Sequence, residues 1–571
     1  MNDIRRTILW VIFGFSMVLL WDQWQVHNGN KATFFPSMGK PIAAASAPAG
    51  AASGSSAATA SASSVPGASP VAAAAAGATP VPVAAPAPAA QKVTVTTDLM
   101  RITFDTAGGS IVREELIHQL SDDKKSNVVL LNDAPGHRYV AETGLIDGNF
   151  PNHTTAMTFT GDLEMKAGAN ELVARFESPV QGGVKLVKTY TFRRGHYEAV
   201  VRHEVTNVGT TPVTPRVYMQ IVRDGSKLEA GGSFFSNPTS TYTGPAIFTE
   251  EKKYQKVEFA DIEKNKADYA KESASGYVAM VQHYFASAWI LPAGVKRENF
   301  VRKIDTNMYS VGVMSQLPAI APGATQTLDA TFFAGPQEET KLEKITPDLE
   351  RVKDYGMFHI IAKPLYWLLA TLHGYLGNWG WSIMALVLLI KIAFYWLQAK
   401  GYQSMAKMKA INPRIMAMRE RYKDKPQEMQ QEMMKIYREE KVNPMGGCLP
   451  IMVQIPVFIA LYWVLLSSVE MRGAPWVGWI HDLSAPDPFF ILPLVMTLTT
   501  LLQTALNPTP PDPMQAKMMW LMPLAFSVMF FFFPSGLVLY WITNNVLSIA
   551  QQWLINTRMG VPPEFNLPKF R

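Results

Sequence analysis

Apolar residues gather in long runs in the C-terminal half of the chain. A membrane-spanning helix requires about 20 predominantly apolar residues, and these runs approach or reach that length. They are Trp379–Leu397, Leu449–Val469, Phe489–Leu506, Met518–Phe533 and Leu537–Ile555. Residues 1–24 hold a further run, Ile8–Leu20, which follows Arg5 and Arg6 and is predicted to be a retained signal anchor. The pattern predicts a multi-pass α-helical membrane protein with six transmembrane helices.

Between the first run and the others the pattern changes. Residues 25–91 are dominated by Ala, Ser, Pro, Gly and Val, which predicts a flexible, partly extended linker. Ala43–Ala45 within it leaves late signal cleavage open as an alternative. Residues 92–347 alternate apolar and polar positions, the period of half-buried strands. Strands are predicted at Val93–Thr96, Arg101–Phe104, Val184–Phe192, Tyr197–Val205, Gly276–Ile290 and Thr325–Phe333. Many short strands at this spacing predict an exported all-β sandwich.

Residues 348–378 mix basic and apolar side chains, which predicts an amphipathic helix on the outer membrane face. The charges of the later loops predict the orientation of the spans. Lys400–Lys441 holds eleven basic residues, whereas Glu470–Pro488 holds only Arg472. Because basic loops stay in the cytoplasm, both termini are predicted to be cytoplasmic and residues 25–378 to lie outside.

One charge lies inside an apolar run. Lys391 is about twelve residues into Trp379–Leu397. An ammonium at such depth costs at least about 2.5–3.5 kcal/mol on insertion scales, so we expect a wet, polar space around it. The alternative is that the long side chain reaches the headgroups and leaves the run otherwise ordinary.

Polar side chains also form stripes along three of the runs. Four share one face of Leu537–Ile555, three threonines share a face of Phe489–Leu506 beside a glutamine, and one glutamine lies within Leu449–Val469. In that order they are Tyr540, Asn544, Ser548 and Gln551; Thr497, Thr500 and Thr504 with Gln503; and Gln454. Together with Lys391 they predict a hydrophilic groove in the bundle. Interhelical hydrogen bonding is the alternative.

The basic loop 400–441 is itself predicted to be a helical hairpin. Apolar residues recur at helical spacing on both sides of Asp424-Lys425-Pro426, and many of them are methionines. Five are candidates for capturing apolar clients, because methionine adapts to many shapes: Met405, Met408, Met418, Met429 and Met433. The alternative is that they pack the hairpin together. Its basic faces could meet anionic lipid or ribosomal RNA.

Composition and motifs argue against enzymatic chemistry. The 571 residues include one cysteine, Cys448, so no internal disulfide can form, and no Cys/His group has metal-ligand spacing. No hydrolase, zinc-peptidase or nucleotide-binding motif occurs, so no cofactor is predicted. Three other readings stay open: a transporter or channel using the polar cavity, an intramembrane enzyme, and a scaffold whose exported domain does the work.

Several stretches together resemble the YidC membrane protein insertase family in its six-span Gram-negative form. They are Gly377–Gly380, Ser404–Met408, Met418–Arg421, Glu440–Cys448, Trp479–Ser484 and Phe533–Tyr540, with Lys188–Tyr197 and Gly276–Ile290 in the exported domain. The resemblance implies a non-enzymatic insertase and chaperone of the bacterial inner membrane, with a periplasmic sandwich. It acts on nascent membrane proteins, alone or with the Sec translocon, through a groove open to cytoplasm and lipid.

The resemblance also assigns roles to single residues. The family has an arginine in the groove where this chain has Lys391, which keeps the charge but loses the planar fork. Tyr540 and Trp541 match aromatic residues that meet clients. The family tail is often basic and faces the ribosome, but Asn556–Arg571 holds only three basic residues, which weakens the prediction of a ribosome contact.

Overall fold

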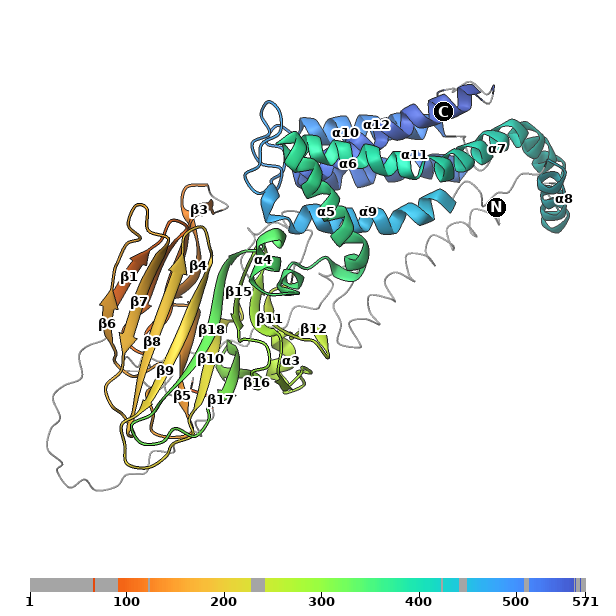
Figure 1. Cartoon of the computed structure of the whole chain (residues 1–571). Helices are drawn as coiled ribbons and strands as arrows, with labels where there is room; N and C mark the ends of the chain where they lie inside the picture. The colour runs from red at the N-terminus through yellow and green to blue at the C-terminus, as the bar shows by residue number, and fades with distance from the viewer. Residues whose placement is uncertain are drawn as a thin grey trace, which may run out of the picture. The chain divides into compact units, whose positions relative to one another are not determined.

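The computed structural model describes residues 65–66, 91–121, 124–226, 242–422, 425–440, 449–507, 513–558, 560 and 565. The described residues divide into two compact units, one ending at Asp354 and the other beginning at Tyr355 (Figure 1). The first is built from strands and the second from helices. The predicted N-terminal span, and the predicted linker except for Val65, Pro66 and Gln91, lie outside the described residues.

The β unit contains two nine-stranded sheets in which all paired strands are antiparallel. In spatial order the first sheet consists of β1 (Lys92–Thr96), β2 (Met100–Asp105), β3 (Ser110–Leu120), β4 (Asn127–Ala134), β5 (His137–Ile146), β10 (Arg216–Asp224), β17 (Met308–Gln316), β16 (Arg297–Asp305) and β13 (Glu272–Ser273). The second consists of β12 (Lys253–Lys256), β11 (Gly244–Thr249), β14 (Tyr277–Gln282), β15 (Phe285–Ile290), β18 (Thr325–Pro336), β9 (Glu198–Asn207), β8 (Val184–Arg193), β7 (Glu171–Glu177) and β6 (Thr158–Gly161). The short helices α3 (Phe259–Glu263), α4 (Glu339–Ile345) and η1 (Leu349–Val352) complete the unit.

Side chains from both sheets meet in one apolar core. The ring of Phe104 in the first sheet lies 4.9 Å from that of Tyr190 and 5.0 Å from that of Phe176, both in the second. Trp289 of β15 donates its indole N–H to the backbone oxygen of Gln220 on β10, at 3.3 Å. The predicted β-sandwich is therefore confirmed. The segment Gly276–Ile290 folds as two strands, β14 and β15, joined at a turn where Tyr284 has a φ of +68°.

Lys188 and His203 are among the ionisable groups that are fully buried inside the sandwich. Lys188 donates its Nζ to the backbone oxygens of Gly108 and Thr143, both at 2.6 Å. Burial lowers the pKa of Lys188 to about 7. His203 has its Nε2 3.0 Å from the Thr143 hydroxyl, and burial, with the nearby Lys188 charge, lowers the pKa of His203 to about 3. His203 is therefore neutral in the folded domain at any pH near neutrality.

The helical unit contains eight helices and three short 3₁₀ turns within the described ranges. The helices are α5 (His359–Leu376), α6 (Trp379–Ala393), α7 (Tyr395–Arg421), α8 (Pro426–Glu439), α9 (Leu449–Ser467), α10 (Ile491–Leu506), α11 (Pro513–Met529) and α12 (Ser535–Arg558), with η2 (Gly356–Phe358), η3 (Val469–Met471) and η4 (Phe530–Phe532). Apolar side chains of α6, α9, α10 and α12 share one core, of which Leu386, Val464, Met496 and Val538 are examples. In Figure 1, α10 and α12 run side by side.

The run predicted as one span, Trp379–Leu397, is broken. Helix α6 ends at Ala393, α7 begins at Tyr395, and the two are bent by 68° at the break. By length and composition this bent pair is the one candidate to cross a membrane among the described helices, and no described helix is long and apolar enough to do so singly. The number of spans therefore stays a prediction.

Local signals fix the start of α6. Gly377 ends α5 with a φ of +66°, and the Asn378 side chain accepts a hydrogen bond from the Trp381 backbone N–H at 3.2 Å, which caps the next helix. Gly380 then lets Trp476 pack against the helix, because a Cβ at this position would lie 2.2 Å from the Trp476 ring. These contacts hold the helix that carries Lys391.

Candidate functional site

A cavity of about 290 Å³ lies among α9, α10 and α12. Six of its eight lining residues carry an amide or hydroxyl group, and the other two are aromatic. The lining consists of Thr500, Gln503, Thr504, Asn507, Asn544 and Asn545, with Phe458 and Trp541. Four of these polar residues were predicted to line a groove, and the structure brings them together: Thr500, Gln503, Thr504 and Asn544.

Side-chain hydrogen bonds tie the two helices on either side of the cavity. Asn545 of α12 is buried and donates to the hydroxyls of Thr499 at 3.2 Å and Thr500 at 2.9 Å on α10. About two turns further along α12, Gln552 donates to the Leu506 backbone oxygen at 3.3 Å. The polar stripe thus provides interhelical hydrogen bonds and the cavity wall at once, so the two predicted alternatives coexist.

Lys391 lies next to the residues that line the cavity but is not one of them. It is in the last turn of α6, where the helix dipole favours a cation, and only 7% of it is exposed. Its Nζ donates to the Ser548 hydroxyl at 2.7 Å, and that hydroxyl donates to the backbone oxygen of Asn544, also at 2.7 Å. Lys391 does not itself line the cavity, but one side chain and one peptide group connect it to Asn544, which does.

Gln454 joins a third helix to the same point. Its amide nitrogen donates to the Asn544 side-chain oxygen at 3.4 Å, and its oxygen accepts from Gln398 of α7 at 3.3 Å. Further along α12, Gln551 is 9% exposed, and neither its amide nitrogen nor its amide oxygen has a hydrogen-bond partner among the described residues. Buried amides are nearly always paired, so this polar surface has spare hydrogen-bonding capacity.

Thr497 does not line the cavity. Its hydroxyl donates to the backbone oxygen of Pro493 in its own helix at 2.8 Å. The two predicted aromatic contacts differ in position. Tyr540 is 4% exposed and packs on Phe458 at 5.6 Å between ring centroids, whereas Trp541 faces the cavity and contacts Phe458 edge-on at 4.7 Å.

Four lining or bridging residues were absent from the prediction: Phe458, Asn507, Asn545 and Gln398. Asn545 adjoins Asn544 in the sequence, a signal that was visible but lies off the predicted stripe. Within the described ranges, no cluster of three or more His, Cys, Asp or Glu is placed to hold a metal ion.

The hairpin of α7 and α8 has a core of its own. Met418 is buried in it, and Met408, Met429 and Met433 pack against it, around Ile415. This contact set favours the packing interpretation for these methionines, while Met405 lies outside the cluster. The exposed methionines of the hairpin are Met416 and Met434, and client capture by the five predicted residues stays a prediction.

Comparison with known proteins places the chain in a family. The model of the 60Kd inner membrane protein family matches residues 371–561, and that of the YidC periplasmic domain matches residues 92–368. The membrane protein insertase YidC of Cupriavidus taiwanensis is 56% identical over 558 residues, which cover 98% of each chain. The chain belongs to the YidC membrane protein insertase family.

A second relative agrees with this assignment, and a solved structure was also matched. The membrane protein insertase YidC of Burkholderia multivorans is 54% identical over 562 residues, covering 98% of this chain and 99% of that protein. A solved structure of an active YidC insertase with its first transmembrane domain resolved is 18% identical, covers 80% of this chain and 91% of that chain, and has a TM-score of 0.36. The resemblance predicted from the sequence is confirmed by the family models and the relatives.

Proposed function

We propose that this chain inserts membrane proteins by receiving the hydrophilic flank of an apolar client segment in the polar cavity of α9, α10 and α12. Membership of the family makes the chain a non-enzymatic membrane protein insertase of the bacterial inner membrane, with nascent membrane proteins as clients. The proposal concerns how its residues do this.

The observation that carries the proposal is the contrast between the two faces of the same helices. Toward the cavity, α10 and α12 present Thr500, Gln503 and Asn544. Away from it they expose large apolar side chains, among them Leu498, which is 67% exposed, and Val546, which is 48% exposed. A lipid-facing surface next to a polar hollow is the arrangement that lets one segment have contact with both environments.

The energetics follow from that contrast. A peptide group or hydroxyl that enters hydrocarbon without a hydrogen bond costs several kcal/mol, which the cavity amides and hydroxyls would offset. The apolar part of the client gains about 25 cal/mol for each Å² that leaves water. Lys391, connected to the cavity through Ser548 and Asn544, would attract acidic residues of the client. No nucleotide is needed on this route.

The finer topology is part of the proposal. Six spans, cytoplasmic termini and periplasmic residues 25–378 are supported by the basic loop 400–441 and by Arg5 and Arg6. Action beside the Sec translocon, lipid contact along α5, and a weak ribosome contact through the tail are supported by the resemblance and by these charges.

Site-specific crosslinking to a stalled nascent client tests the proposal. Photoreactive residues at Gln503 and Trp541, which line the cavity, should crosslink strongly to the client. Thr497 is the matched control, since it lies on the same helix as Gln503 but outside the cavity. Equal crosslinking from all three positions, or crosslinking from Thr497 alone, would contradict the proposal.

A further inference from the structure

The first sheet of the sandwich has a buried polar surface on the face opposite the core. Along β5, β10 and β17, residues alternate between the two faces, so that Ala141, Ile221 and Val311 enter the core while Glu142 and Gln220 point away from it. A solvated outer face would leave these polar side chains exposed. Glu142 is instead 2% exposed and Gln220 is fully buried.

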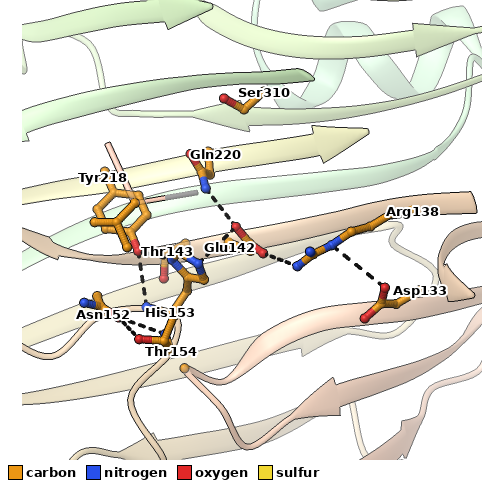
Figure 2. Close-up of polar contacts among 12 residues, drawn as sticks. Asp133, Arg138, Glu142, Thr143, Asn152, His153, Thr154, Tyr218, Gln220 and Ser310 are labelled. Carbon is orange, nitrogen blue, oxygen red and sulfur yellow. Dashed lines mark hydrogen bonds and ion pairs between the residues drawn. The ribbon is translucent and has the colours of Figure 1, made fainter. Parts of the chain in front are cut away.

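These side chains form a continuous network (Figure 2). The Glu142 carboxylate accepts from Arg138 at 3.0 Å and from the Gln220 amide at 2.8 Å. His153, from the loop after β5, has its Nε2 3.7 Å from the same carboxylate and its Nδ1 2.5 Å from the Tyr218 hydroxyl. The buried carboxylate is thus held by an arginine, an amide and a ring nitrogen.

Arg302 of β16 connects this network to a distant segment of the chain. Its Nη2 donates to the Gln220 side-chain oxygen at 3.3 Å, and its Nε donates to the Ser310 hydroxyl at 3.3 Å. Its Nη1 donates to the backbone oxygen of Val65 at 3.1 Å. One guanidinium therefore binds the network and the main chain of the predicted linker together.

Val65 and Pro66 are seated on the apolar margin of the same face. The Val65 side chain packs against a separate cluster made of Ile146, Tyr218, Phe300 and Met314. Pro66 is buried, although residues 25–91 were predicted to be a flexible, partly extended linker. Proline brings no N–H into the site, so its burial leaves no donor unsatisfied.

We propose that this face is a docking site for a peptide in which an apolar residue precedes proline, and that Val65-Pro66 of the chain itself is the resident occupant. Arg302 donates to a backbone oxygen, the cluster packs against the apolar side chain, and the proline is buried next to it in the chain. Docking fixes the exported segment to the sandwich 26 residues before β1 begins at Lys92. It divides the predicted linker at one defined point.

Labelling of a cysteine within the site tests this in the full-length protein. Cys448→Ser removes the one native cysteine, and Met314→Cys then places a thiol under Val65, at a position that is 9% exposed. Deletion of residues 61–70 should raise the rate of maleimide labelling at position 314 at least fivefold. Deletion of residues 77–86 is the matched control, since it removes ten residues including another Val-Pro pair, Val81-Pro82, and should change the rate less than twofold.

A synthetic peptide of residues 61–70, added to the protein that lacks them, should return labelling to within twofold of the full-length rate. The same peptide with Val65→Asp should not. Restoration by the peptide also shows that the face is intact after the deletion. Slow labelling without residues 61–70, equal acceleration by both deletions, or failure of the peptide to protect would each overturn the proposal.

Discussion

Lys391→Met is the sharpest test of the charge behind the cavity. The substitution keeps an unbranched side chain of similar length but removes the ammonium. The Ser548 hydroxyl keeps its own bond to the Asn544 backbone oxygen, so the packing of α12 should change little. Because a buried cation is costly to hold, removing it should leave the stability of the folded protein unchanged or raise it. The loss should appear in insertion instead.

The size of that loss follows from the contacts. Two hydrogen bonds of 2.7 Å lead from Lys391 to the Asn544 backbone oxygen, and a client carboxylate that accepts from the Asn544 side-chain amide adds about another 3 Å. At about 8 Å and an effective dielectric constant of about 20, two unit charges attract by about 2 kcal/mol. This corresponds to about 30-fold in occupancy. Lys391→Arg should retain most of it.

The assay is insertion of a Sec-independent client in a depletion strain, scored by protease accessibility of its exported segment. Two clients are compared, one with an aspartate in that segment and one with asparagine there. Lys391→Met should impair the aspartate client about 30-fold and the asparagine client little, while Lys407→Met on the exposed face of α7 should affect neither. If Lys391→Met inserts the aspartate client as well as the wild type does, the reasoning is refuted. If the variant impairs both clients equally, Lys391 acts through packing and not through its charge.

Three further predictions concern stability. His203 stays neutral in the folded sandwich, where its pKa is about 3, but it is protonated below about pH 6.5 in the unfolded chain. The free energy of unfolding should therefore fall by about 2 kcal/mol between pH 7 and 5. In urea unfolding, His203→Gln should remove that part of the loss. Asn545→Ala, which leaves the Thr500 hydroxyl without its interhelical donor, should destabilise the bundle by about 1–2 kcal/mol in steric-trap unfolding, whereas an unchanged stability would make that contact dispensable. Gly380→Ala should cost about 1–3 kcal/mol and lower the Tm in detergent, while Gly374→Ala, with open space at its Cβ, should not lower it.

Much of the architecture follows from short-range patterns. The alternation in Val184–Phe192 predicts β8, and Pro426 marks the first residue of α8. No comparable sequence signal predicts the break at Phe394, because neither glycine nor proline occurs there. The position of the break depends on how α6 and α7 pack on the other helices.

The candidate site also has a part that was predictable from the sequence and a part that was not. The face shared by Asn544 and Ser548 is a property of one helix, so periodicity predicted it. The role of Asn545 and the exclusion of Thr497 depend on how α10 and α12 are rotated against each other, and one helix alone does not contain that angle. The docking of Val65 was equally hidden, since its partners come from strands far along the chain.

Asn544 accepts hydrogen bonds from two different partners, each through a different oxygen atom. Its side-chain oxygen accepts from Gln454, and its peptide oxygen accepts from the hydroxyl that solvates Lys391. Gln454 therefore already occupies one acceptor site of the amide that a client group would meet, and any rotation of the peptide group disturbs the cation on the neighbouring helix. Binding of a client group at Asn544 is therefore coupled to the hydrogen bonding of the Lys391 ammonium on the neighbouring helix. A change in either one shifts the other.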